Sequence, residues 1–379
     1  MFKFFVTAAF LASFFCVSAQ ADTTGCVLML PSGKHLYHEH VPDNAAHHYY
    51  GLLEGPAWEN YYCAWRTYTD YENRNCVDMT GKYKYGPSLS NYNDPAVDVH
   101  ADNPWGTDIF EIGYTLGLGA FRVQYGDTVW RNPQMAVNLD SLVVDLIDTS
   151  YTSPKFRIAY WGWKITTTAK INAFWTFQTK KTMRSTVCDL KIEGQLNNTK
   201  IVVGMTKIAG TTLTQDAAKG NLITIGKQSQ FLDSLMMAIH ADTPYFNKFT
   251  SDKNNWAMLL NLDANQTARW AFTFSWVKEP APLFRQSNWQ ASLFTDLSQI
   301  VAVSKDGFQK PRDNKYRGQE NALKAGSMIA YNISGKVVHG NFSSFVSNRI
   351  RNQVPNGIYF VKDKNAQHAG LVRICSINK

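Results

Sequence analysis

Side chains that could do chemistry are densest between His35 and Asp108. Sugars are bound by aromatic rings against their C–H faces and by carboxylates and arginines on their polar groups, and an acidic sugar also needs a cation for its carboxylate. The region therefore predicts a carbohydrate site. The predicted substrate-binding residues are Trp58, Tyr61, Arg66, Tyr68, Arg74, Asp78 and Trp105.

Glu59, His100 and Asp108 are the predicted catalytic residues. Glycoside hydrolysis would use two carboxylates about 5–10 Å apart, such as Glu59 with Asp108. Lyase chemistry on a uronate would instead use a base such as His100 and a cation such as Arg66. The alternative interpretation of Arg66 is a buried arginine paired with Asp78 or Glu59 for structural reasons.

No metal site is predicted. His38 and His40 could share a strand face, but the sequence has no HExxH motif and no CxxC pair. It also lacks the GxSxG motif of serine hydrolases and any phosphate-cradling or dinucleotide-binding glycine loop. The identity of a cofactor, if one is used, is left open by the residues.

Alternating apolar and polar residues dominate residues 58–278 and predict an all-β fold. Helices are predicted only at 230–239 and 289–302. The predicted strands cover 109–117, 121–130, 141–150, 156–165, 170–179, 183–192, 200–208, 256–262 and 268–277. Four more are predicted at 328–333, 336–338, 357–361 and 371–376. The abundant aromatics, 13% of the chain, could serve as sugar platforms or simply fill a wide sandwich core.

The first 21 residues resemble a cleavable signal peptide. Lys3 is followed by a short apolar stretch and by Ala19-Gln20-Ala21, the small-x-small pattern of a cleavage site. No later segment is apolar enough to span a membrane. We therefore expect a secreted or cell-surface protein.

The expected compartment determines whether the cysteines can form disulfides. Disulfides are possible in an exported protein, and Cys63 with Cys76 is the first expectation among Cys26, Cys63, Cys76, Cys188 and Cys375.

Composition divides the rest of the chain into three segments. Residues 22–304 form a β-rich body, residues 305–321 a polar basic linker and residues 322–379 a small β module. From Lys305 onward the chain carries 13 Lys and Arg against 4 Asp and Glu. Such a basic tail could dock on an acidic polymer. Nucleic acid is not an expected partner, because no nucleic-acid motif is present.

The body resembles a bacterial family known as domain of unknown function 4861. The matching segments are GPAWEN at 55–60, AWRTY at 64–68, RNCVDMTGK at 74–82, WGTDI at 105–109 and GYTLGLGAF at 113–121. The resemblance implies a galactose-mutarotase-like β-supersandwich and a polysaccharide-utilisation context, but no particular reaction.

The C-terminal module resembles the sorting domain of the type IX secretion system. The resemblance rests on AYNISGKVV at 330–338 and PNGIYFVK at 355–362. It implies that the secretion machinery is a partner. Together these patterns predict a secreted protein that processes plant-type, acidic, pectin-like polysaccharides as a lyase or glycoside hydrolase. The alternative is a non-catalytic cell-surface protein that binds a polysaccharide or oligosaccharide.

Overall fold

The computed structural model describes residues 24–30, 34–41, 53–69, 75–92, 94, 97–134, 137–194 and 199–300, together with the backbone of four strands beyond residue 327. The chain divides into two compact units, Met1–Phe308 and Gln309–Lys379. The predicted signal peptide and linker lie outside the described residues.

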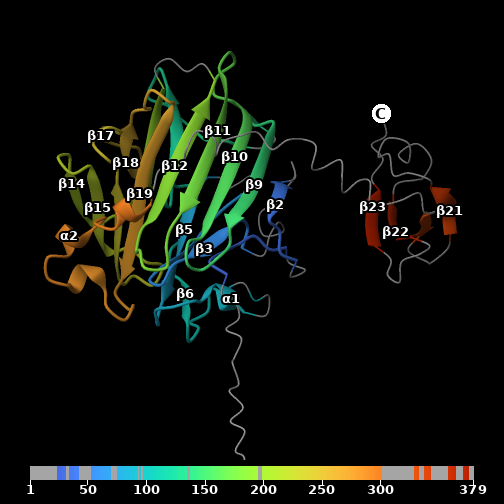
Figure 1. Ribbon diagram of the computed structural model, residues 1–379, viewed down its shortest axis with the longest axis horizontal. Helices are drawn as coiled ribbons and strands as arrows, with labels where there is room; N and C mark the ends of the chain where they lie inside the picture. The colour runs from blue at the N-terminus through green and yellow to red at the C-terminus, as the bar shows by residue number, and fades with distance from the viewer. Residues whose placement is uncertain are drawn as a thin grey trace, which may run out of the picture. The chain divides into compact units, whose positions relative to one another are not determined.

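The first unit is built around a nine-stranded antiparallel sheet (Figure 1). In spatial order its strands are β14 (Thr212–Asp216), β15 (Asn221–Lys227), β16 (Ser234–His240), β19 (Thr267–Trp276), β12 (Thr186–Glu193), β11 (Lys170–Gln178), β10 (Lys155–Lys164), β9 (Ser141–Asp148) and β2 (His38–Val41).

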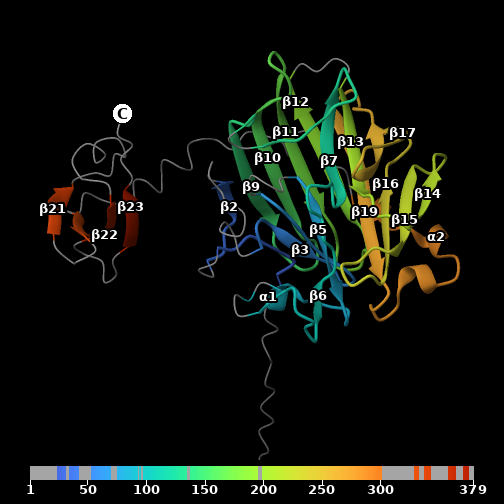
Figure 2. The same ribbon diagram turned by 180° about the vertical axis from the view of Figure 1, so that it is seen from behind.

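Two five-stranded antiparallel sheets pack against one face of the large sheet (Figure 2). One contains β17 (Phe246–Ser251), β18 (Asn255–Leu260), β13 (Thr199–Thr206), β7 (Leu118–Tyr125) and β8 (Trp130–Arg131). The other contains β1 (Cys26–Val27), β3 (Ala57–Glu59), β4 (Ala64–Thr67), β5 (Val77–Lys82) and β6 (Gly106–Asp108). The predicted all-β sandwich is confirmed.

Aromatic side chains fill the core between these sheets. Six tryptophans are less than 2% exposed: Trp58, Trp65, Trp163, Trp175, Trp270 and Trp276. Alternate residues of β19, among them Phe272 and Phe274, point into this core, while Thr273 points to the opposite face. Much of the aromatic content is therefore structural.

Both helix predictions fail. Residues 230–239 end in strand β16, which is buried on its two faces, so its apolar run has no clear period. Within residues 289–300, the described part of the second prediction, the only helical elements are the short helix α2 (Trp289–Ser292) and the 3-10 turn η2 (Leu297–Gln299). With the 3-10 turn η1 (Leu283–Arg285), this segment packs on the outer face of the large sheet.

Two further expectations are corrected. Residues 109–117 do not form a strand, and α1 (Leu89–Tyr92), a short helix, was not predicted. The Cys63–Cys76 disulfide is also wrong: Cys26, Cys63 and Cys188 are buried free thiols. In the β4–β5 register Ala64 faces Thr80 and Thr67 faces Val77, so Cys63 and Cys76 flank opposite ends of the hairpin.

The second unit contains a four-stranded antiparallel sheet in the order β21 (Val337–Phe342), β20 (Met328–Asn332), β22 (Gly357–Asp363) and β23 (Gly370–Ile374). Its strands overlap the four predicted for the C-terminal module. Within the parts of the chain that the structure describes, no helix is long and apolar enough to cross a membrane.

Candidate functional site

Arg66 is the centre of a buried polar cluster, and strand register explains why. Arg66 in β4 lies directly opposite Asp78 in β5, and Asp108 in β6 lies opposite Thr80, two residues further along β5. The three side chains therefore share one face of the sheet. Arg66 Nη2 lies 2.8 Å from Asp78 Oδ2 and 2.9 Å from Asp108 Oδ2, and Arg66 Nε also donates to Asp78 Oδ2 at 3.0 Å.

Tyr68 and His100 extend this cluster. The Tyr68 hydroxyl donates to Asp78 Oδ2 at 2.8 Å, and the Arg66 guanidinium lies over the Tyr68 ring. His100 Nδ1 lies 3.3 Å from Asp108 Oδ2. The His100 side chain is 63% exposed, whereas that of Asp108 is only 3% exposed. The cluster therefore reaches solvent through one imidazole, and five predicted residues are brought together.

Negative charge is in excess within the cluster. Besides Asp78 and Asp108, Glu54 places Oε2 3.9 Å from Arg66 Nη1. Burial and the neighbouring Asp108 charge raise the pKa of Asp78 to about 7. The hydrogen bond to Asp108 raises the pKa of His100 above its usual value. The pKa values of a buried carboxyl group and of an exposed imidazole are thus both raised within one cluster, and perturbed pKa values of this kind are common at functional sites.

Glu59 lies in a separate buried ion pair. Its Oε2 accepts from Lys82 Nζ at 2.6 Å, and both side chains are 0% exposed. The backbone amides of Ser88 and Leu89 donate to the same carboxylate, and Lys82 Nζ also donates to the carbonyls of Asn60 and Gly86. A carboxylate this enclosed cannot reach a substrate, so the placement of Glu59 among the catalytic residues is corrected to a structural role.

The remaining predicted residues are dispersed. Trp58 is a core residue, stacked on Trp65 and donating through its indole N–H to Thr186. Trp105 is partly buried in a small apolar cluster. Tyr61 is 39% exposed and its ring centroid lies 5.6 Å from that of Tyr85. Arg74 lies outside the described residues.

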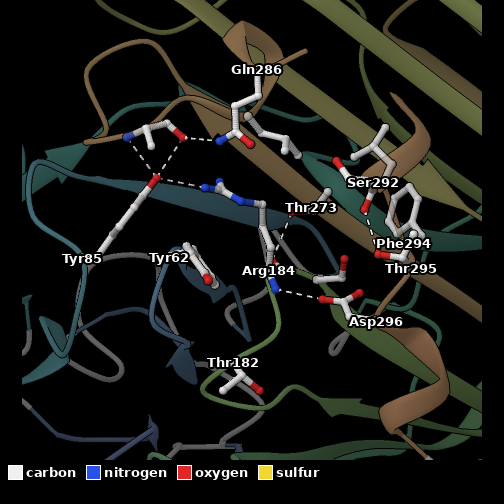
Figure 3. Close-up of a pocket in the computed structure, with 14 residues that line it drawn as sticks. Tyr62, Tyr85, Thr182, Arg184, Thr273, Gln286, Ser292, Phe294, Thr295 and Asp296 are labelled. Carbon is white, nitrogen blue, oxygen red and sulfur yellow. Dashed lines mark hydrogen bonds between the residues drawn. The ribbon is translucent and has the colours of Figure 1, made fainter. Parts of the chain in front are cut away.

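A cavity of about 350 Å³ was not predicted from the sequence. It lies where the start of β12 and the middle of β19 meet the segment from Ala281 to Asp296, and Tyr62 and Tyr85 close another side (Figure 3). Arg184 lies at its centre. No local motif marks this place, because its lining comes from segments widely separated in the chain. Tyr61, which borders the tyrosine pair, was the one sequence signal nearby.

An antiparallel β-sandwich with a buried cluster of Arg66, Asp78 and Asp108 on a short β-sheet defines the general class of this protein. Its family model matches residues 18–302, and the chain belongs to the family described as a domain of unknown function, DUF4861. No curated protein matches the chain in sequence.

Proposed function

We propose that the protein is an exported glycan-processing protein that acts on acidic, plant-type polysaccharides by acid–base chemistry at His100. One observation carries the proposal: the exposed His100 imidazole is held by a buried carboxylate that shares Arg66 with a second carboxylate. Buried carboxylates that orient an accessible histidine are a frequent arrangement for proton transfer.

The Asp108 contact selects the reacting nitrogen of His100. When neutral, the imidazole donates Nδ1–H to Asp108, so Nε2 carries the lone pair that can accept a proton. On a uronate, Nε2 would take the C5 proton, a C4–C5 double bond would form, and the C4–O bond would break. The imidazolium would then return the proton to the departing oxygen. Asp108 stabilises the imidazolium between these two steps.

This geometry favours a lyase over a hydrolase. A hydrolase needs two carboxyl groups that flank the scissile bond on opposite sides. Asp78 and Asp108 instead bind the same guanidinium nitrogen, Arg66 Nη2, and are 2% and 3% exposed. A sugar ring has no room between them.

A non-catalytic glycan-binding function is the second candidate. It is favoured by the commitment of Arg66 to Asp78 and Asp108, because this arginine then offers little positive charge to a uronate. Export rests on the signal-peptide pattern of residues 1–21, and recognition by the type IX machinery rests on the sequence resemblance of residues 322–379.

The test is incubation with polygalacturonate and alginate, followed by absorbance of unsaturated products and by reducing-end assays. We expect wild-type protein to form unsaturated products and His100→Gln to lower the rate by about 10²–10⁴, the usual contribution of a general base. His240→Gln is the matched control, since His240 also contacts an aspartate, Asp242, at 3.1 Å.

Three results would decide against parts of this proposal. Product formation that survives His100→Gln would remove His100 from the mechanism. Retention on a polygalacturonate gel without any product would favour the binding protein. The absence of both product and retention on every acidic glycan tried would reject the proposed substrate class.

A further inference from the structure

The Arg184 cavity combines a sugar-sized volume with polar groups that face inward. Its volume, about 350 Å³, lies at the lower end of the range for small-molecule sites. Tyr62 and Tyr85 provide ring surface, with centroids 5.1 Å apart in an edge-to-face arrangement. Leu283, Leu293 and Phe294 provide apolar contacts on the side of the Ala281–Asp296 segment.

Arg184 is already neutralised by the protein. Nη1 contacts the Glu279 carboxylate at 3.1 Å and also donates to the Phe274 carbonyl. Nη2 donates to the Tyr85 hydroxyl at 3.1 Å, and the guanidinium lies 4.9 Å from the Tyr62 ring centroid. Asp296, which accepts from the Arg184 backbone amide, adds a further carboxylate to the lining. The cavity therefore has no surplus positive charge to attract an anion.

Four hydroxyl groups of the lining already donate to the protein. Tyr85 donates to the Ala281 carbonyl, Thr273 to the Arg184 carbonyl, Ser292 to the Trp289 carbonyl and Thr295 to the Ser292 carbonyl. A hydroxyl that donates once can still accept. The oxygens of Thr273, Ser292 and Thr295 can thus accept from a ligand, as can the Asp296 carboxylate, and the cavity suits a ligand that supplies several hydrogen-bond donors.

We infer that this cavity binds one neutral sugar unit of a glycan. Hydroxyl groups on such a ring can donate to the Ser, Thr and Asp oxygens, while its C–H face packs on the tyrosine and leucine side chains. A uronate or phosphate brings acceptor atoms and negative charge, which this lining opposes. The site would supply affinity and chain position, separate from the chemistry at His100.

The inference is independent of the proposed acid–base function. None of the cavity residues belongs to the His100 cluster, which consists of Glu54, Arg66, Tyr68, Asp78, His100 and Asp108. Neutral-sugar binding can therefore be present or absent whatever the result at His100. Retention of this binding by His100→Gln would show that the two sites are distinct.

The experiment uses saturation-transfer NMR and calorimetry on the full chain. The probes are the methyl glycosides of galactose, glucose and xylose, each compared with methyl galacturonate carrying a free carboxylate. We expect at least one neutral glycoside to bind more tightly than the uronate. Thr295→Trp should abolish this binding by filling the cavity, whereas Thr295→Ser should preserve it. Gln215→Ala, on exposed strand β14, is the surface control.

Asp296→Asn tests the charge argument directly. It keeps an acceptor for the Arg184 amide but removes one negative charge, so the preference for neutral sugar over uronate should shrink by about tenfold. The inference is overturned if no neutral glycoside binds, if the uronate binds wild-type protein more tightly, or if folded Thr295→Trp binds as wild type does.

Discussion

Replacing Lys82 by Met tests whether the Glu59–Lys82 pair holds the short sheet together. Lys82 Nζ donates to Glu59 at 2.6 Å, to the Asn60 carbonyl at 2.7 Å and to the Gly86 carbonyl at 2.8 Å, with no solvent access. Met removes the charge and leaves the Glu59 carboxylate buried without a counter-ion. Breaking such a pair costs about 3–5 kcal/mol of unfolding free energy.

The matched control is Lys170→Met. Lys170 Nζ also lies 2.6 Å from a carboxylate, that of Asp140, but these side chains are 51% and 53% exposed. An exposed pair contributes about 0–1 kcal/mol. The two substitutions are thus equal in chemistry and in distance, and they differ in burial. Urea unfolding followed by tryptophan fluorescence measures both, because the core tryptophans change environment on unfolding.

A double-mutant cycle completes this test. Glu59→Gln combined with Lys82→Met should be less destabilising than the sum of the single changes, since the neutral amide no longer needs a counter-ion. If Lys82→Met loses less than about 1 kcal/mol, or no more than Lys170→Met, the buried pair does not stabilise the sheet as argued. Glu59→Gln that folds normally but alone abolishes catalysis would restore Glu59 to the catalytic set.

Three further predictions concern titratable groups. The fold raises the pKa of Asp78 from 3.8 to about 7, so the stability that protonated Asp78 contributes is complete below about pH 4 and is lost as the pH rises through 7. Asp78→Asn should therefore make the melting temperature less dependent on pH over that interval. An unchanged pH profile would contradict this. NMR titration should find the pKa of His100 above its usual value, and Asp108→Asn should lower it; if it does not, their contact is absent in solution. Burial raises the pKa of Cys26 and of Cys63 to about 12, so a thiol reagent should modify these cysteines only after unfolding, and fast labelling of native protein would refute their burial.

Strand periodicity predicted most of the sandwich because the core-facing residues of many strands are apolar, whereas the opposite face carries polar residues such as Arg157, Asn172 and Thr176. The predicted segments 141–150, 156–165 and 170–179 coincide closely with β9, β10 and β11. Strand β16 was missed because Met236 and Ala238 on its outer face are as apolar as the residues on its core face, so the alternation that distinguishes a strand from a helix is absent. The sequence pattern therefore predicts strands whose two faces differ in polarity, and it misses strands whose two faces are both apolar.

The Arg66 cluster was partly predictable. Arg66 and Asp78 are 12 residues apart in a hairpin, and the structural alternative of an Arg66–Asp78 pair is confirmed, whereas an Arg66–Glu59 pair is not observed among the described contacts. The Arg184 cavity could not be predicted from the sequence, because Tyr62, Arg184, Thr273 and Asp296 become neighbours only through tertiary packing.

The segments that carry the family resemblance meet in the two buried clusters. Glu59 comes from the first segment and Lys82 from the third, while Arg66, Asp78 and Asp108 come from the second, third and fourth. A one-residue slip of β4 or β5 would turn these charges to the opposite face and leave them unpaired, at a cost of several kcal/mol. These motifs therefore specify register, and their presence alone identifies no reaction.

Any catalytic function must then depend on side chains that this strand pairing positions but leaves exposed to solvent. His100 lies between the third and fourth segments and is exposed above Asp108, so the buried cluster supplies its orientation and its raised pKa. If this reasoning is right, His100→Gln should leave the unfolding free energy nearly unchanged while lowering product formation, whereas Arg66→Leu should destabilise the fold by leaving two buried carboxylates unpaired. Equal loss of stability in both variants would mean that His100 belongs to the structural cluster after all.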